Sequence, residues 1–454
     1  MSELPKGWVE CKLVDFVQYL PTGVPKFIGE KEYYSTGSIQ DSKYIPEGIF
    51  AFDNRPSRAN RISKIGDVFQ ARMKGTDKGL LIDDKLNNKL FSTGFIQLRP
   101  YENTYESKLL YYFVKSKIFI DQKDELVTGS TQEALTDSKA KELTILVPPL
   151  NEQKRIVEKL DKLLSKVEEA KARLEKIPVI LKRFRQSVLN AAVTGELTKD
   201  WRERNGINEE WEEESLRKLC KKFTYGSSKK SDVKGKVPVL RMGNIQDGKI
   251  VWDDLKYSSD ADEILKYSLK DGDVLFNRTN SPELVGKTAI YRGERPAIYA
   301  GYLIKITTNE NLEPEFLNLC LNSVKSKEWC MQVKTDGVSQ SNINAKKLAD
   351  FKILTPPLEE QKEIVHRVES LFKKADEIEE RYKKAKEYVD KLTQSILAKA
   401  FRGELVPQDP NDEPASVLLE RIKLEKEKLN KDKKQKKRAR AGEFKEKHLD
   451  RVRE

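Results

Sequence analysis

The sequence is poor in the residues that most catalytic and metal sites need. Its 454 residues include only two histidines, His366 and His448, and four cysteines, with no C-x-x-C pair among them. This pattern argues against a zinc site, a disulfide framework and a Ser-His-Asp arrangement. Unpaired cysteines are typical of a reducing compartment, so we expect a cytoplasmic protein.

Glycine-rich cofactor fingerprints are also missing. The nearest approach to a phosphate-binding loop is "SPELVGKT" (281–288), in which Ser281 replaces the first glycine. The residues that follow it, "AIYR", suggest a strand where such a loop needs a helix N-terminus. We therefore expect no cofactor, no metal and no catalytic residue in this chain.

Long apolar runs are absent as well. No stretch approaches the 18 or so apolar residues of a membrane-spanning helix, and "MSELPKGWVECK" does not resemble a secretory signal. A chain of this length, with 38% hydrophobic and 35% charged residues, is expected to form two or more domains.

Positive charge is abundant but unevenly spread. The net charge is +12, of which the 35 residues from Glu420 onward hold +7, from 15 Lys and Arg against 8 Asp and Glu. Such a tail is most simply a solvated helix end that touches phosphates without reading sequence. Any case for nucleic acid must therefore come from the remaining 419 residues.

The main feature that is present is an internal repeat. "PPLNEQKRIV" at 148–157 returns as "PPLEEQKEIV" at 356–365, and residues 146–197 match 354–405 without a gap at 21 of 52 positions. Weaker similarity extends upstream, where Trp8 aligns with Trp211 and "IGDVF" (65–69) with "DGDVL" (271–275). The chain is therefore a duplicated unit of roughly 200 residues.

Each strongly repeated segment predicts a long helix. Apolar residues recur at alternating steps of four and three, which is typical of a coiled-coil seam. The predicted seam residues are Ile156, Leu160, Leu163, Val167, Leu174, Leu181, Ile364, Val368, Leu371, Ile378, Tyr382 and Val389. Because this phase continues through Pro178, we expect one kinked helix in the first copy, and a straighter one in the second, where Lys386 stands. Packing of the two helices against each other is favoured over a homodimeric coiled coil.

The remaining segments carry short β-type runs followed by a helix. They predict an α+β fold: two similar mixed domains separated by two long antiparallel helices about a pseudo-two-fold axis. The predicted boundaries are 1–147 and 198–355 for the globular domains, 148–197 and 356–405 for the helices, and 406–454 for a helical, basic tail.

These features together resemble a known family. "PPLNEQKRIVEKLD" and "PPLEEQKEIVHRVE", each followed by a long helix and "GEL", and "GDVLFNRTNSPELVGK" (272–287) are similar to the specificity subunits of type I restriction–modification enzymes. The resemblance implies two target-recognition domains that each read one half of a split site in double-stranded DNA. It also implies helices that dock two methyltransferase subunits, through which restriction subunits join. S-adenosylmethionine, ATP and magnesium would then belong to the partners.

Polar side chains on loops are the groups that read base edges, with Arg or Lys suited to guanine and Asn or Gln to adenine. The candidates in the first domain are Gln70, Arg72, Lys74, Lys78, Thr131, Gln132, Arg55, Arg58 and Arg61. Those in the second are Asn277, Arg278, Thr279, Asn280, Lys287, Ser339 and Gln340. For Arg72 and Arg278 the alternative is that they fasten their loops to the domain, and for Arg55, Arg58 and Arg61 it is a solvated loop.

The repeated Glu-Gln-Lys at the start of each helix allows two interpretations. Glu152, Gln153, Lys154, Glu360, Gln361 and Lys362 could cap the helix, where an acidic residue suits the dipole, or form part of the methyltransferase dock. A rival to the whole scheme is a coiled-coil adaptor that links two protein partners without binding DNA. Sequence-selective DNA retention in the presence of its methyltransferase would distinguish the two.

Overall fold

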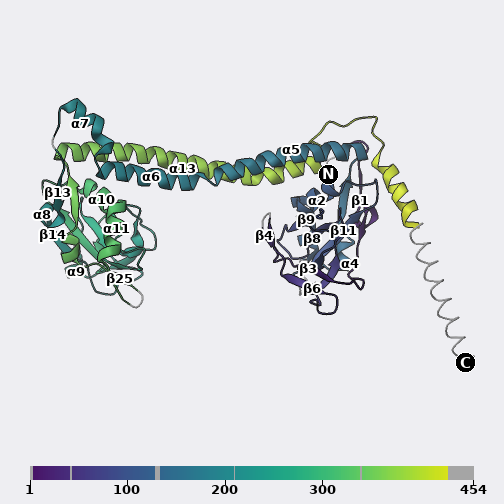
Figure 1. Cartoon of the computed structure of the whole chain (residues 1–454), viewed down its shortest axis with the longest axis horizontal. Helices are drawn as coiled ribbons and strands as arrows, with labels where there is room; N and C mark the ends of the chain where they lie inside the picture. Colours follow the sequence, from purple (N-terminus) through teal and green to yellow (C-terminus); the bar gives the residue numbers. More distant parts are fainter. Residues whose placement is uncertain (1–3, 41–42, 128–132, 209, 338–339, 428–454) are drawn as a thin grey trace, which may run out of the picture. The chain divides into compact units, whose positions relative to one another are not determined.

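The computed structural model describes residues 4–40, 43–127, 133–208, 210–337 and 340–427 (Figure 1). The chain divides into two compact units. Unit 1 comprises residues 1–172 with 386–454, and unit 2 comprises residues 173–385. Both boundaries fall within the long helical segments, so each unit holds one globular part together with a portion of both helical segments.

Within the described residues, unit 1 has twelve named strands and five named helices, besides its part of one long helix that continues into unit 2. The strands are β1 (Val9–Lys12), β2 (Val17–Tyr19), β3 (Glu30–Tyr34), β4 (Ile39–Gln40), β5 (Lys43–Tyr44), β6 (Gly48–Ala51), β7 (Ala59–Ile62), β8 (Val68–Ala71), β9 (Gly79–Leu81), β10 (Leu90–Ser92), β11 (Phe95–Pro100) and β12 (Thr144–Val147). The helices are α1 (Leu13–Phe16), α2 (Ser107–Lys115), α3 (Lys117–Val127), α4 (Asp137–Ala140) and α5 (Leu150–Leu174).

Two four-stranded sheets form the body of unit 1, in the orders β6-β3-β10-β7 and β2-β11-β8-β9. β1 pairs antiparallel with β12, from Val9 opposite Val147 to Lys12 opposite Thr144. This pairing ties the beginning of the chain to the strand that leads into α5.

Unit 2 repeats this plan. Its strands are β13 (Glu212–Ser215), β14 (Cys220–Tyr225), β15 (Val237–Leu240), β16 (Ile245–Gln246), β17 (Lys249–Ile250), β18 (Lys256–Ser258), β19 (Val274–Asn277), β20 (Thr279–Asn280), β21 (Thr288–Ile290), β22 (Ile298–Tyr299), β23 (Leu303–Thr308), β24 (Thr335–Asp336), β25 (Ser341–Asn342) and β26 (Lys352–Thr355). Its helices are α6 (Ile177–Val193), α7 (Lys199–Asn205), α8 (Leu216–Leu219), α9 (Ala261–Tyr267), α10 (Pro314–Asn322), α11 (Val324–Val333) and α12 (Ala345–Ala349), with short 3-10 turns at Glu196–Thr198 and Met242–Asn244.

The main sheet of unit 2 has the order β14-β23-β19-β21, and a three-stranded sheet has the order β18-β15-β22. β13 pairs antiparallel with β26, as β1 does with β12. The α+β duplication predicted from the sequence is therefore confirmed at the level of strand pairing.

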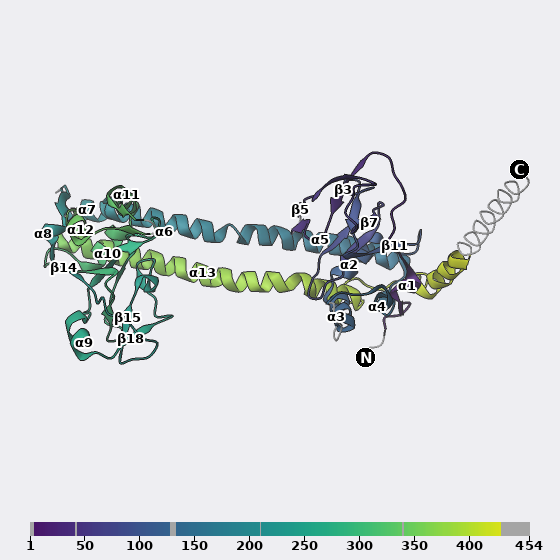
Figure 2. The ribbon, with the colours of Figure 1, turned by 90° about the horizontal axis from the view of Figure 1, so that it is seen from below.

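The helix α13 (Leu358–Phe401) is continuous over 44 residues and contributes to both units. In unit 1 its last turns pack antiparallel to α5, and Ile396, Leu397, Ala400 and Phe401 share a core with Ile156, Leu160 and Val167. In unit 2 its first turns pack against α6, where Ile364 and Val368 share a core with Val188 and Ala192. Figures 1 and 2 show the helices side by side in both views.

The first helical segment differs from the prediction of one kinked helix. α5 ends at Leu174 and α6 begins at Ile177, so two helices replace one. Pro178 lies in the first turn of α6, where its missing N–H has no intrahelical partner to lose. α13, with Lys386 at the equivalent position, continues unbroken as expected.

One predicted seam residue is wrong. Ile378 is 47% exposed, although Ile156, Leu160, Val167, Leu181, Ile364 and Val368 are buried and Leu163, Leu174, Leu371, Tyr382 and Val389 are partly buried. At this level the two helices of unit 2 are joined by charge, because Arg185 on α6 binds Asp376 at 2.7 Å and Glu379 at 2.9 Å on α13. No helix among the described residues is long and apolar enough to cross a membrane.

Candidate nucleic-acid interface

The loop between β8 and β9 of unit 1, residues 72–78, begins with a tightly held arginine. Arg72 donates from Nε to the Phe95 carbonyl at 3.1 Å and from Nη1 to the Leu135 carbonyl at 3.0 Å, and it pairs with Asp137. Its Nη2 also donates to the Tyr19 hydroxyl at 3.1 Å. Arg72 therefore fastens the loop to the domain, which was the alternative to base reading.

The other predicted residues of this loop divide by exposure. Gln70 is fully buried and donates to the Thr76 carbonyl at 3.3 Å, so it supports the loop from beneath and does not reach a base. Lys78 is partly buried, with Nζ donating to the Thr36 carbonyl at 2.9 Å. Lys74 is exposed at the tip of the loop.

The arginine cluster of unit 1 is less solvated than expected. Arg61 is buried, donates from Nη1 to the Leu20 carbonyl at 2.8 Å, and its pKa is lowered to about 10 by burial and by the nearby positive charge of Arg72. Arg55 lies over the Phe52 ring at 4.0 Å and bonds the Phe52 and Ala59 carbonyls. Arg58 is the exposed member of the three.

The corresponding loop of unit 2 runs from residue 278 to residue 287, between β19 and β21. Asn277 is fully buried at the end of β19, so it cannot touch a base directly. Arg278 stacks over the Tyr225 ring at 4.7 Å, and its backbone bonds Tyr302 and Ile343. Arg278, like Arg72, therefore anchors its loop.

The remaining predicted residues of unit 2 have polar partners on neighbouring segments. Thr279 accepts a hydrogen bond from Asn342 at 2.7 Å, Asn280 accepts one from the Ser281 backbone at 2.9 Å, and Lys287 donates to Gln246 at 2.7 Å. Gln340 is exposed. Thr131, Gln132 and Ser339 lie outside the described residues.

The repeated Glu-Gln of unit 1 closes a joint between the globular part and α5. Glu152 is buried, and its Oε2 accepts the indole N–H of Trp8 at 3.0 Å. Gln153 is also buried. Its Nε2 donates to the carbonyls of Pro148 at 2.9 Å and Thr104 at 3.3 Å, while its Oε1 accepts the Glu106 backbone N–H at 3.0 Å, just before α2.

Unit 2 builds the same joint from the second copy. Glu360 Oε2 accepts the indole N–H of Trp211 at 3.1 Å. Gln361 donates to the carbonyls of Pro356 at 2.9 Å and Asn311 at 3.0 Å, and accepts the Glu313 backbone N–H at 2.8 Å, just before α10.

These contacts correct the docking prediction for four residues. Glu152, Gln153, Glu360 and Gln361 are buried and bonded within their own units, so they fix each globular part to its helix. Only Lys154 and Lys362 of the repeated Glu-Gln-Lys are exposed. The alignment of Trp8 with Trp211 was the sequence signal for this joint, since a buried indole N–H needs an acceptor.

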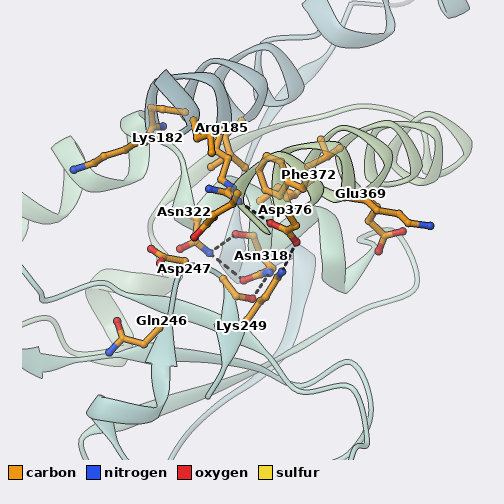
Figure 3. Close-up of a pocket in the computed structure, with 18 of the residues that line it drawn as sticks. Lys182, Arg185, Gln246, Asp247, Lys249, Asn318, Asn322, Glu369, Phe372 and Asp376 are labelled. Atoms are coloured by element: carbon orange, nitrogen blue, oxygen red, sulfur yellow. Dashed lines mark hydrogen bonds and ion pairs between the residues drawn. The ribbon is translucent and has the colours of Figure 1, made fainter. Parts of the chain in front are cut away.

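A groove of about 1080 Å³ lies within unit 2, between α6, α13, α10 and the β16–β17 turn. Figure 3 shows Arg185 and Lys249 directed at Asp376, with Lys249 Nζ 3.4 Å from its carboxylate. Leu181, Leu319, Val365 and Phe372 give the groove an apolar lining, while Lys182, Lys373 and Glu369 supply charge.

The architecture defines a duplicated protein whose two mixed α+β parts are each clasped to a long helix by the same Trp-Glu-Gln joint. The family model for the type I restriction modification DNA specificity domain matches residues 5–179 and again 208–387. The chain therefore belongs to the family of type I restriction enzyme specificity subunits, which serve DNA sequence recognition.

Curated relatives agree over nearly the whole length. The chain is 35% identical over 453 residues to the EcoKI specificity subunit of Escherichia coli K12, covering 94% of this chain and 97% of the relative. It is equally identical to the StySPI specificity subunit of Salmonella potsdam, covering 94% and 96%.

Solved structures support the fold. A chain from a study of type I R-M complex assembly and conformational transition aligns with a TM-score of 0.70 at 22% identity, covering 89% of this chain and all of that one. The HsdS subunit of Thermoanaerobacter tengcongensis aligns with a TM-score of 0.61 at 24% identity, covering 88% and 98%.

Proposed function

We propose that each unit reads one half of a bipartite DNA site, with the loops 72–78 and 278–287 among the reading segments. The observation that carries this proposal is the contrast between the joints and the loops. The Trp-Glu-Gln joint occurs in matched form in both units, whereas the loops differ in length, with seven residues in unit 1 and ten in unit 2. A shared frame with different loops suits two readers of different sequences.

The division of a site into two halves also suits the energetics. Each mismatched base pair costs about 1–3 kcal/mol, so a half-site of a few pairs discriminates weakly, while two readers in one chain add their free energies. Because the loops are not equivalent, the two half-sites should differ in sequence.

The test is to co-express the chain with its methyltransferase subunits and sequence the methylated bases of the host. We expect one bipartite, asymmetric motif with a fixed spacer, carrying methylated adenine. A continuous motif, or a palindromic one, would contradict the two-reader proposal, and the absence of any motif would favour the adaptor alternative.

We also propose that the groove of unit 2 receives a segment of a methyltransferase subunit, and that restriction subunits join through that partner. The groove combines an apolar lining with exposed lysines, as a protein interface does. Methyl transfer from S-adenosylmethionine and ATP- and magnesium-dependent cleavage would then take place on the partners.

Charge reversal at the groove tests this docking. The double variant Lys182→Glu with Lys373→Glu changes two exposed lining residues and should reduce co-purification of the methyltransferase about tenfold or more. Lys384→Glu, on the same helix α13 but outside the groove lining, is the matched control. Equal co-purification of the double variant and the control would overturn the docking proposal.

A further inference from the structure

A buried lysine lies beneath the reading loop of unit 1. Lys123, on α3, has no exposed surface, and its ammonium donates to the carbonyls of Met73 at 2.7 Å and Thr76 at 2.6 Å. Both carbonyls belong to the loop 72–78. The loop backbone therefore folds around a positive charge supplied by a helix that follows it in sequence.

Two more side chains, one on α3 and one on β8, also bind the backbone of this loop. The Gly75 backbone N–H donates to both carboxylate oxygens of Asp124 on α3, at 3.1 and 3.0 Å. The buried Gln70 donates to the same Thr76 carbonyl that Lys123 binds. Two carbonyls and one N–H of a short loop are thus fixed by side chains from α3 and β8.

Burying an ammonium group carries a large desolvation cost unless its donors are satisfied. Consistent with that cost, burial lowers the pKa of Lys123. The loop held in this way is itself exposed at Met73, Lys74 and Gly75. A buried charge that holds the backbone of an exposed loop favours one loop conformation over the alternatives, which is what recognition of a fixed base edge requires.

Among the described residues of unit 2, no buried lysine holds the corresponding loop 278–287. Its equivalent of α3 is α11, in which Cys330 occupies the position that aligns with Lys123 when Ser116 and Ser323, the residues before the two helices, are matched. There the sulfur packs against Gly286 of the longer loop, where an added Cβ would lie 2.5 Å from Sγ. Lys123 is therefore not part of the structure that the two units share. It is one of the residues in which the two units differ.

We propose that Lys123 is a positioning residue for sequence recognition: by holding the Met73 and Thr76 carbonyls it fixes the loop with which unit 1 reads its half-site. The inference rests on the proposed function. It states that the bases recognised in one half-site depend on the conformation of the loop 72–78, which Lys123 on α3 fixes. It predicts that disturbing the loop from beneath changes the recognised sequence without changing the other half-site.

Two variants with different risks to folding test this inference in the complex with methyltransferase subunits. Lys123→Met keeps the aliphatic stem and removes the donor from the two carbonyls. Gly75→Ala changes the exposed side of the loop. Gly75 has φ of +69°, which an alanine adopts only with strain, and an added Cβ would meet nothing within 4 Å. The substitution therefore strains the loop conformation without causing a steric clash. Lys117→Met, on the exposed face of α3, and Gly29→Ala, at an exposed glycine with φ of +82° and open space around its Cβ, are the matched controls.

The readout is the set of methylated sites, found by sequencing. We expect both test variants to weaken discrimination roughly tenfold at one or more bases of a single half-site, while the other half-site and the spacer stay as in the parent chain. The controls should leave the motif unchanged.

The outcomes separate this inference from the proposal beneath it. If the parent chain yields no bipartite motif, the proposed function fails. If the parent yields one and Gly75→Ala leaves its half-sites and their base discrimination intact, the loop does not read bases and the inference is overturned. Loss of discrimination in Gly75→Ala but not in a folded Lys123→Met would also overturn it, since the lysine would then not position the loop.

Discussion

The Trp-Glu-Gln contacts are the same in the two joints, and we call them the clasp, but the residues around them differ. In unit 2 the second carboxylate oxygen of Glu360 accepts hydrogen bonds from Arg202 at 2.6 Å and Thr198 at 2.7 Å. In unit 1, among the described residues, the second oxygen of Glu152 has no hydrogen-bond partner although it is buried. Duplication therefore preserved the geometry of the clasp without preserving its charge balance.

The sequence explains the difference. Continuing the offset of 208 past the end of the repeat places Val406 at the position of Thr198 and Pro410 at that of Arg202, and neither side chain can donate a hydrogen bond. Burial consequently raises the pKa of Glu152, against the lowering effect of the Trp8 hydrogen bond.

Unit 1 has a different reinforcement at the same place. Its C-terminal segment returns to the joint, where Asp412 binds Arg155 at 2.6 Å and the Ala415 backbone N–H donates to the Gly7 carbonyl at 2.9 Å. Ala415, Leu418 and Ile422 are buried in the core of unit 1. The joint of unit 1 is thus reinforced by an ion pair outside the clasp and by apolar packing, whereas the joint of unit 2 is reinforced by hydrogen bonds to the shared glutamate itself.

The largest difference should appear when the shared glutamate of unit 2 is neutralised. Glu360→Gln removes the negative charge that pairs with Arg202 and turns one of two occupied acceptor oxygens into an amino group that faces a donor, so we expect unit 2 to lose about 3 kcal/mol of stability. Hydrogen exchange of the amides around α10 and the start of α13 measures this locally. Arg202→Met with Glu360→Gln should recover part of the loss, and a single variant as stable as the parent would contradict the ionic description.

The equivalent change in unit 1 should have a much smaller effect. Glu152→Gln keeps an acceptor for Trp8 and removes a carboxylate that burial disfavours, so the stability at neutral pH should change by about 1 kcal/mol or less. A cost as large as that of Glu360→Gln would show that the two joints are energetically alike.

The same residue predicts a pH dependence. A carboxyl whose pKa is higher in the folded than in the unfolded chain binds its proton more tightly when folded. Glu152 therefore destabilises unit 1 as pH rises from about 4.3, its usual value, through the raised folded pKa, above which the penalty is constant. The difference between parent and Glu152→Gln, followed by hydrogen exchange of unit 1 across this range, should grow with pH and then level off.

Much of the fold could be predicted because the sequence contains an internal repeat. The repeat of 52 residues and the seven-residue apolar period predicted the duplicated α+β plan and the antiparallel helices. The break at 175–176 was missed because the apolar phase continues through Pro178, and a proline in a first helical turn leaves the phase of the helix intact. Ile378 was misassigned because Arg185 replaces apolar contact there with ion pairs, which periodicity does not reveal.

Two of the residues predicted to read bases are buried in the structure. Gln70 and Asn277 have the right chemistry for adenine, yet both are buried, because each lies within a strand and only the residues after it reach the surface. The role of Lys123 has no signal in the sequence, since a lysine in a helix is usually exposed and nothing in the local pattern indicates that a loop about fifty residues earlier folds over it.

The smallest expected effect is also the most direct test of how the joints differ. Val406→Thr introduces a hydroxyl, in a side chain of nearly the same shape, at the position that the offset of 208 aligns with Thr198, whose hydroxyl donates to Glu360 in unit 2. By analogy we expect the new hydroxyl to donate to the free oxygen of Glu152. Because a buried acceptor gains a donor, we expect unit 1 to be stabilised by about 0.5 kcal/mol near neutral pH, with the pKa of Glu152 moved back towards its ordinary value. Val406→Ala, which removes packing without adding a donor, should destabilise instead. If Val406→Thr stabilised the protein equally in a Glu152→Gln background, the gain would not come from the carboxylate, and the missing donor would not be what separates the two joints.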